Sequence, residues 1–119
     1  MTNEQQLAYV AGFFDGEGSI SLRVRSGKYP FLQLSMTQTS RPVLEFVQGV
    51  LGVGIIHGPY APSNGLSRKH KYVYRVCQRA QVVEVMRALW PYCIVKRPTI
   101  LAALEHVGAP LLADTAASC

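Results

Sequence analysis

Two carboxylates stand one residue apart near the start of the chain, in the segment Asp15-Gly16-Glu17-Gly18. Apolar side chains just before this segment recur at helical spacing: Leu7, Val10, Ala11 and Phe14. They predict a helix over residues 4 to 14 that ends at the two glycines. The C-terminus of a helix favours a cation, and carboxylate and carbonyl oxygens suit Mg²⁺. The segment could therefore hold a divalent metal, although the same four residues also form ordinary turns.

The spacing of apolar residues along the chain predicts the helices and strands that would position this segment. The period becomes two after the glycines and predicts strands at residues 19–25, 31–38, 53–60 and 71–77. A second helix is expected between a cap at Thr39 or Ser40 and Gly52, and further helices at residues 79–90 and 99–107. The order αββαββα plus a closing helix predicts an α+β fold, with helices on one face of an antiparallel sheet.

The composition is that of a folded domain. The 119 residues are 49% hydrophobic and 16% charged, which predicts one globular domain. No apolar run reaches the roughly 18 residues of a membrane span, and the N-terminus is too polar for a signal peptide. We expect an intracellular protein that is not secreted, with no membrane partner. Residues 1–108 are expected to form the domain and residues 109–119 a flexible tail.

The three cysteines, Cys77, Cys93 and Cys119, lack the spacing of a disulfide framework or a zinc site. We expect two core thiols and one tail thiol. The segment from Gly52 to Gly58 has a glycine spacing close to that of a dinucleotide loop, but it follows a helix and leads into a strand, which is the wrong context.

Basic residues dominate the middle of the chain. The sequence holds 12 Lys and Arg against 7 Asp and Glu, a formal net charge of +5. No acid lies between Glu17 and Glu45 or between Glu45 and Glu84, and these intervals hold most of the basic residues: Arg23, Arg25, Lys28, Arg41, Arg68, Lys69, Lys71, Arg75 and Arg79. One surface is therefore expected to be strongly positive, which makes nucleic acid the first partner to test. A ribosome-type or membrane-surface patch has the same charge.

The outward positions of the predicted strands carry side chains suited to base edges and phosphates: Ser21, Arg23, Arg25, Gln33, Ser35, Lys71 and Arg75. We add three candidates from turns and the third strand: Lys28, Arg68 and His57. His57 fits equally well as a surface histidine without a role, and the basic run at Arg68 as a solvated loop. An antiparallel sheet with this face can lie along a DNA groove.

The segment from Leu7 to Ile20 resembles the LAGLIDADG motif of homing endonucleases, with Val10-Ala11-Gly12-Phe13-Phe14-Asp15-Gly16-Glu17-Gly18 in its nine positions. Val10 replaces the leading leucine of the motif, and Glu17 replaces its second aspartate. The resemblance extends over residues 5 to 107, because the element order matches the family. Gln38 matches a glutamine often found at the end of the second strand, and Lys96 matches the active-site lysine of the family.

This resemblance implies a site-specific endonuclease that cuts double-stranded DNA by metal-assisted phosphodiester hydrolysis. Mg²⁺ is the implied cofactor, and Ca²⁺ or Mn²⁺ could occupy the same site. Glu17 would bind the metal beside the Gly16 carbonyl, Lys96 would stabilise charge near the scissile phosphate, and Gln38 would order a water. Asp15 would hold the helix end. The resemblance leaves open whether Arg41 or Arg97 assists.

A single motif implies a homodimer in this family, and a two-fold protein reads a near-palindromic site. The small residues Ala8, Ala11 and Gly12 would let two motif helices approach closely; alternatively, the helix only packs on its own sheet. Pairing with a different half-protein is a further possibility. The same fold also serves in intron RNA maturases and in regulators that only bind DNA. The retained Glu17, Gln38 and Lys96 favour the nuclease.

Overall fold

The computed structural model describes residues 1–23, 31–61 and 69–111, with Arg23 described by its backbone. The elements follow the predicted order: α1 (Asn3–Glu17), β1 (Gly18–Arg23), β2 (Phe31–Gln38), α2 (Arg41–Leu51), β3 (Ile55–Tyr60), β4 (Lys71–Val76), α3 (Arg79–Leu89), a 3₁₀ turn η1 (Trp90–Tyr92) and α4 (Arg97–Val107). The two central hairpins therefore lie between helices, as the change of apolar period predicts.

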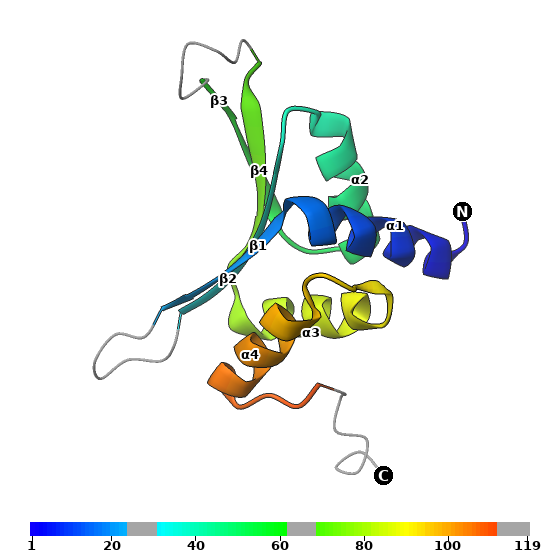
Figure 1. Ribbon diagram of the computed structural model, residues 1–119. Coiled ribbons are helices and arrows are strands. Elements are labelled where there is room, and N and C mark those ends of the chain that lie inside the picture. The colour runs from blue at the N-terminus through cyan, green and yellow to red at the C-terminus, as the bar shows by residue number, and fades with distance from the viewer. Residues whose placement is uncertain (24–30, 62–68, 112–119) are drawn as a thin grey trace.

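The four strands form one antiparallel sheet in the order β1-β2-β4-β3. Each hairpin contributes two neighbouring strands, and β2 joins them by pairing with β4, where Met36 lies opposite Tyr74. Figure 1 shows the helices gathered on one side of this curved sheet, while its other face is uncovered. The α+β fold with helices on one face is confirmed.

The core lies between the helices and the covered face of the sheet. Leu32, Leu34 and Met36 alternate along β2 and are almost completely buried. Tyr74 on β4 is also fully buried, and its hydroxyl donates a hydrogen bond to the Val53 carbonyl oxygen. Burial raises the pKa of Tyr74 to about 12. This tyrosine is therefore a core residue.

The first helix differs from its prediction at both ends. It begins earlier, because Thr2 and Gln5 form a capping box in which each side chain accepts the backbone N–H of the other residue. At the other end it runs through Glu17 into β1 without a left-handed turn, since Gly18 is extended at φ −84°. The predicted glycine turn is wrong. Gly18 is needed because a Cβ there would lie 2.0 Å from the Phe14 ring.

Two further predicted boundaries can be compared with the structure: the end of α2 and the end of the domain. Gly52 ends α2, as predicted, and its backbone is left-handed with φ 73°. Residues 109–111 pack on the domain beyond its predicted end: the Ala109 N–H donates to the Leu104 carbonyl, and Arg87 donates to the Pro110 carbonyl at 3.0 Å. The rest of the predicted tail, residues 112–119, lies outside the described residues.

In the described ranges, every helix is too short or too polar to cross a membrane.

Candidate functional site

The end of α1 presents Glu17 at the surface. Glu17 is the last residue of the helix and its side chain is exposed. The chain enters β1 at the next residue, so Glu17 lies where α1 meets the sheet, a junction that can be followed in Figure 1. The last carbonyls of a helix have no partners within it, and the Gly16 carbonyl is one of these. The predicted carboxylate and carbonyl therefore share one helix end.

Gln38 reaches the same end of the sheet from β2. Gly18 at the start of β1 lies opposite Met36, and Gln38 follows two residues beyond that pair. The Gln38 Oε1 accepts hydrogen bonds from the Thr39 backbone N–H at 2.7 Å and the Thr39 hydroxyl at 3.1 Å. Its Nε2 makes no hydrogen bond within the described residues and is free to donate. Register thus places an amide donor beside the end of α1.

Lys96 is tied to the end of α1 through Asp15. The Asp15 carboxylate accepts the backbone N–H of Ile94 at 2.8 Å and of Lys96 at 3.1 Å. The Lys96 Nζ in turn donates to the Asp15 carbonyl oxygen at 3.2 Å. Desolvation opposes ionisation of Asp15, but the backbone hydrogen bonds outweigh it and lower the pKa of the carboxyl group. Asp15 therefore holds the segment that carries the lysine.

Lys96 thus contacts the end of α1 that carries Glu17, and strand register brings Gln38 to the same end of the sheet. Among the described residues, no three His, Cys, Asp or Glu side chains form a group that could hold a metal. The Asp15 carboxylate is already used on backbone N–H groups, which leaves Glu17 as the free carboxylate at this end. One chain therefore offers a partial set of oxygen ligands rather than a closed metal site.

The two arginines considered as assistants are engaged elsewhere within the chain. The Arg97 guanidinium lies 4.6 Å from the centre of the Trp90 ring and donates to the Pro91 carbonyl at 3.4 Å. The Arg41 guanidinium lies 5.5 Å from the Tyr72 ring, and its Nε lies 3.8 Å from Glu45. These contacts give both side chains a structural role.

Cys93 lies under the same helix end as a core thiol. It is 1% exposed, and its Sγ lies 3.9 Å from the Ala11 carbonyl oxygen. Burial, followed by the nearby Asp15 carboxylate, raises the pKa of Cys93 to about 12. The thiol stays protonated at neutral pH and is not a nucleophile. Cys77 departs from its prediction: it is exposed rather than in the core.

The uncovered face of the sheet, which we call the open face, carries most of the predicted reading residues. Cross-strand pairs place Ser19 opposite Ser35, Ser21 opposite Gln33 and Ser35 opposite Arg75. His57 lies opposite Val73, and Tyr60 opposite Lys71, on the same face. Arg23 is opposite Phe31 by its backbone. Three predicted residues lie outside the described residues: Arg25, Lys28 and Arg68.

Sequence reasoning did not place Ile55 or Cys77 on the open face. Ile55 lies opposite Arg75 and is 64% exposed, although its place in an apolar strand predicts an inward side chain. The Cys77 Sγ lies 3.7 Å from the Gln33 Oε1, which puts the thiol on this face beyond the end of β4. The alternation of β4, continued by one residue, predicts this placement of Cys77.

The small residues of α1 do not share one face. Ala8 and Gly12 are exposed and lie one turn apart, and a Cβ at Gly12 or Gly16 would meet nothing within 4 Å. Ala11 is fully buried in the core of its own chain, because it turns toward the sheet with Val10 and Phe14. The prediction of Ala11 at a dimer interface is therefore wrong, and the exposed stripe consists of Ala8, Gly12 and Gly16.

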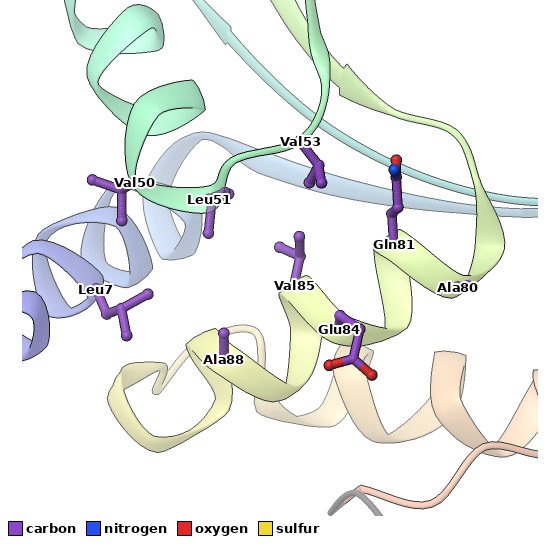
Figure 2. A pocket seen from close by; sticks show the side chains of 9 residues that line it. All are labelled: Leu7, Val50, Leu51, Val53, Ala80, Gln81, Glu84, Val85 and Ala88. Atoms are coloured by element: carbon purple, nitrogen blue, oxygen red, sulfur yellow. The ribbon is translucent and has the colours of Figure 1, made fainter.

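A hollow of about 400 Å³ lies among the helices, away from both the end of α1 and the open face. Figure 2 shows its lining, which is apolar apart from Gln81 and Glu84: Leu7, Val50, Leu51, Val53, Ala80, Gln81, Glu84, Val85 and Ala88. The Glu84 carboxylate is paired with Arg87 at 2.9 Å. This hollow has no converging polar groups that could do the chemistry expected of the site.

A model of the LAGLIDADG-like domain matches residues 4–87 of the chain. The chain belongs to the LAGLIDADG family. The match includes α1 with its motif, the complete sheet and most of α3. It ends before Lys96, so the assignment of the lysine depends on its contacts with Asp15 rather than on the family model. No curated protein matches the chain.

Solved structures of LAGLIDADG proteins share the fold. The homing endonuclease I-CvuI, in complex with its target in the presence of Ca, matches with a TM-score of 0.72 at 22% identity, over 89% of this chain and 68% of that one. The archaeal intron-encoded homing endonuclease I-Vdi141I, complexed with DNA, matches with a TM-score of 0.68 at 26% identity, over 87% and 67%. The meganuclease I-AabMI matches with a TM-score of 0.66 at 24% identity, over 84% of this chain but 35% of that one.

Proposed function

We propose that this LAGLIDADG protein is a homodimeric, Mg²⁺-dependent endonuclease that cuts double-stranded DNA at a long, near-palindromic site inside the cell. The observation that supports this most directly is the contact of Lys96 with the end of α1 that carries Glu17, with Gln38 at the same end of the sheet by strand register. Two similar structures, I-CvuI and I-Vdi141I, are complexes of homing endonucleases with DNA. The open face of the sheet, with Arg75 and Lys71, adjoins the same helix end.

Glu17 and the Gly16 carbonyl fit a divalent metal only if further ligands come from DNA, water or a second chain. Glu17 and the Gly16 carbonyl are hard oxygen ligands of the kind that Mg²⁺ prefers, and Mg²⁺ also accepts phosphate oxygens and waters. A second chain placed by a two-fold axis would add a second Glu17. When bound, the metal would make a water more acidic and neutralise charge on the phosphate.

The remaining side chains have roles that follow from their contacts. Lys96 uses one of its three ammonium donors on the Asp15 carbonyl, which leaves two for a scissile phosphate. Gln38 keeps its amide oxygen on Thr39 and has its amide N–H groups available for a water. Glu17 would hold the metal. No protein nucleophile is required, since water attacks the phosphorus.

The dimer would form through the exposed stripe of α1. Small residues let two helix backbones approach closely, and Ala8, Gly12 and Gly16 offer open space above the helix. The two helix ends would then lie near the symmetry axis, each serving one DNA strand. The longer I-AabMI chain, of which this chain matches 35%, has room for a second such domain within one polypeptide.

A selection for cleaved sites tests this proposal. Purified wild type, Glu17→Gln and a control, Glu105→Gln, would be incubated with a randomised duplex library and MgCl₂. Glu105 is an exposed carboxylate on α4, far along the chain from the motif. We expect wild type and the control to cut one two-fold-symmetric sequence, and Glu17→Gln to bind it without cutting. Binding without cutting by wild type would contradict the nuclease and favour a regulator; enrichment only from an RNA library would favour a maturase.

A further inference from the structure

A row of three paired residues crosses the open face. Ser35 on β2 lies opposite Arg75 on β4, and Arg75 lies opposite Ile55 on β3. Side chains of directly paired residues in an antiparallel sheet point to the same face, with Cβ atoms about 5 Å apart. Within the described residues, Arg75 makes no hydrogen bond or ion pair. The row therefore presents a free guanidinium between a hydroxyl and an aliphatic side chain.

Ile55 is unusual for an isoleucine in a strand. It is 64% exposed, while its neighbour Ile56 turns inward and packs on the core. β3 is the edge strand of the sheet, so Ile55 has Arg75 on one side and no strand on the other. A large aliphatic side chain at such a position leaves apolar surface in water, which costs free energy unless a partner covers it.

The backbone register of the first hairpin, β1 and β2, also pairs an arginine with a hydrophobic residue. Arg23 on β1 lies opposite Phe31 on β2, and Phe31 is 42% exposed. Each hairpin therefore places one arginine position directly across from one exposed hydrophobic residue. The repetition in both hairpins of the open face indicates a pattern suited to one extended partner.

The major groove of DNA presents one chemical group that suits Arg75 and another that suits Ile55. Guanine presents two acceptors that suit a bidentate arginine, and thymine is the base that presents a methyl group. Successive base pairs lie about 3.4 Å apart, so side chains about 5 Å apart reach the same or adjacent base pairs. The spacing of Arg75 and Ile55 matches such a step.

We propose that Arg75 and Ile55 read a guanine and a neighbouring thymine, with Ile55 covering the thymine methyl group. Ile55 is thus a specificity-determining residue that acts by apolar contact. This inference rests on the proposed function, because it assumes that the open face lies in the major groove of the target.

Deoxyuridine scanning tests the pair. The duplex selected by wild type would be synthesised with each thymine replaced in turn by deoxyuridine, which removes only the methyl group. We expect binding to weaken about fourfold at one thymine per half-site, the effect of losing one buried methyl-sized group. Ile55→Ala should bind the thymine and deoxyuridine forms of that position equally. Arg75→Ala should lose the preference for guanine at the same or adjacent base pair.

Leu101→Ala is the matched control, because Leu101 is an aliphatic residue that is 47% exposed on α4, on the helix side of the sheet. It should keep the wild-type deoxyuridine profile.

A wild type that binds its site selectively but responds to no deoxyuridine, or an Ile55→Ala variant with an unchanged profile, would overturn the inference. Failure of wild type to bind any duplex selectively would instead contradict the proposed function. A change in oligomeric state with Ile55→Ala would assign this residue to a contact between edge strands and overturn the inference as well.

Discussion

Asp15 and Lys96 hold each other reciprocally across 81 residues of sequence. The Asp15 carboxylate accepts the Lys96 backbone N–H at 3.1 Å, and the Lys96 ammonium donates to the Asp15 carbonyl oxygen at 3.2 Å. The first contact fixes the backbone that carries the lysine, and the second fixes its charged end beside α1. The position of the proposed catalytic lysine therefore depends on an aspartate that is not itself expected to bind metal.

Asp15→Asn tests this dependence. The amide has one acceptor oxygen, and its NH₂ group would face the N–H of Ile94 or Lys96, so at least one hydrogen bond is lost. We expect a loss of stability of about 1–2 kcal/mol and a larger fall in the cleavage rate than in DNA affinity. Urea unfolding, duplex binding and cleavage would measure the three quantities. Equal cleavage rates at saturating DNA would contradict the positioning role.

The pH dependence of stability gives a second test of Asp15. Its carboxyl pKa is lower in the folded chain than the ordinary value of 3.8, so the unfolded chain binds a proton first as the pH falls. The stabilisation is present above pH 3.8 and is lost as the pH falls through the lower folded value. The stability difference between wild type and Asp15→Asn should therefore be constant from pH 7 to about 5 and shrink below about pH 4. A difference that grows on acidification would have the wrong sign.

Gly18→Ala tests the junction between α1 and β1. A Cβ at this position would lie 2.0 Å from the Phe14 ring and 2.6 Å from the Phe14 carbonyl oxygen. We expect a loss of stability of about 1–3 kcal/mol, because the ring and the backbone must both shift. Gly49→Ala is the control: it lies in α2 with nothing within 4 Å of an added Cβ, so it should be neutral or stabilising. Thermal unfolding that ranks the two variants in the opposite order would contradict this account.

Gly12→Leu tests the proposed dimer. Its side chain enters open space in the isolated chain, so the fold should be unaffected, but it would separate two α1 helices that pack through their small residues. Sedimentation should show about twice the chain mass of 13.1 kDa for wild type and one chain mass for the variant. Gly49→Leu, at an open position on α2, should stay dimeric. A dimeric Gly12→Leu would place the interface elsewhere.

Local patterns predict the elements well. The alternation of Leu32, Leu34 and Met36 indicates both the strand and its buried face, and Gly52 marks the end of α2 by its own backbone preference. The role of Gly18 was not predictable in this way. A glycine at this position is compatible with a left-handed turn or with close packing of a side chain against its backbone. Which of the two occurs depends on where the Phe14 ring packs.

The candidate site combines local and long-range information. Glu17 and Gln38 stand at element ends that periodicity locates, but Lys96 is brought to them by contacts with Asp15 that leave no local signal in the sequence. Ile55 was missed because an aliphatic residue in a strand is expected to turn inward. Its outward position follows from the register with Arg75, which depends on how β3 pairs with β4.

The most direct test of the central claim is the cleavage of the selected duplex by wild type and Glu17→Gln, followed over time in MgCl₂ and in EDTA. The account predicts cutting by wild type in MgCl₂ alone, and no cutting by Glu17→Gln at protein concentrations where the two bind equally. Glu105→Gln should cut like wild type. Cutting by Glu17→Gln at a rate close to that of wild type, or cutting by wild type in EDTA, would contradict the assignment of a metal-dependent site to the end of α1.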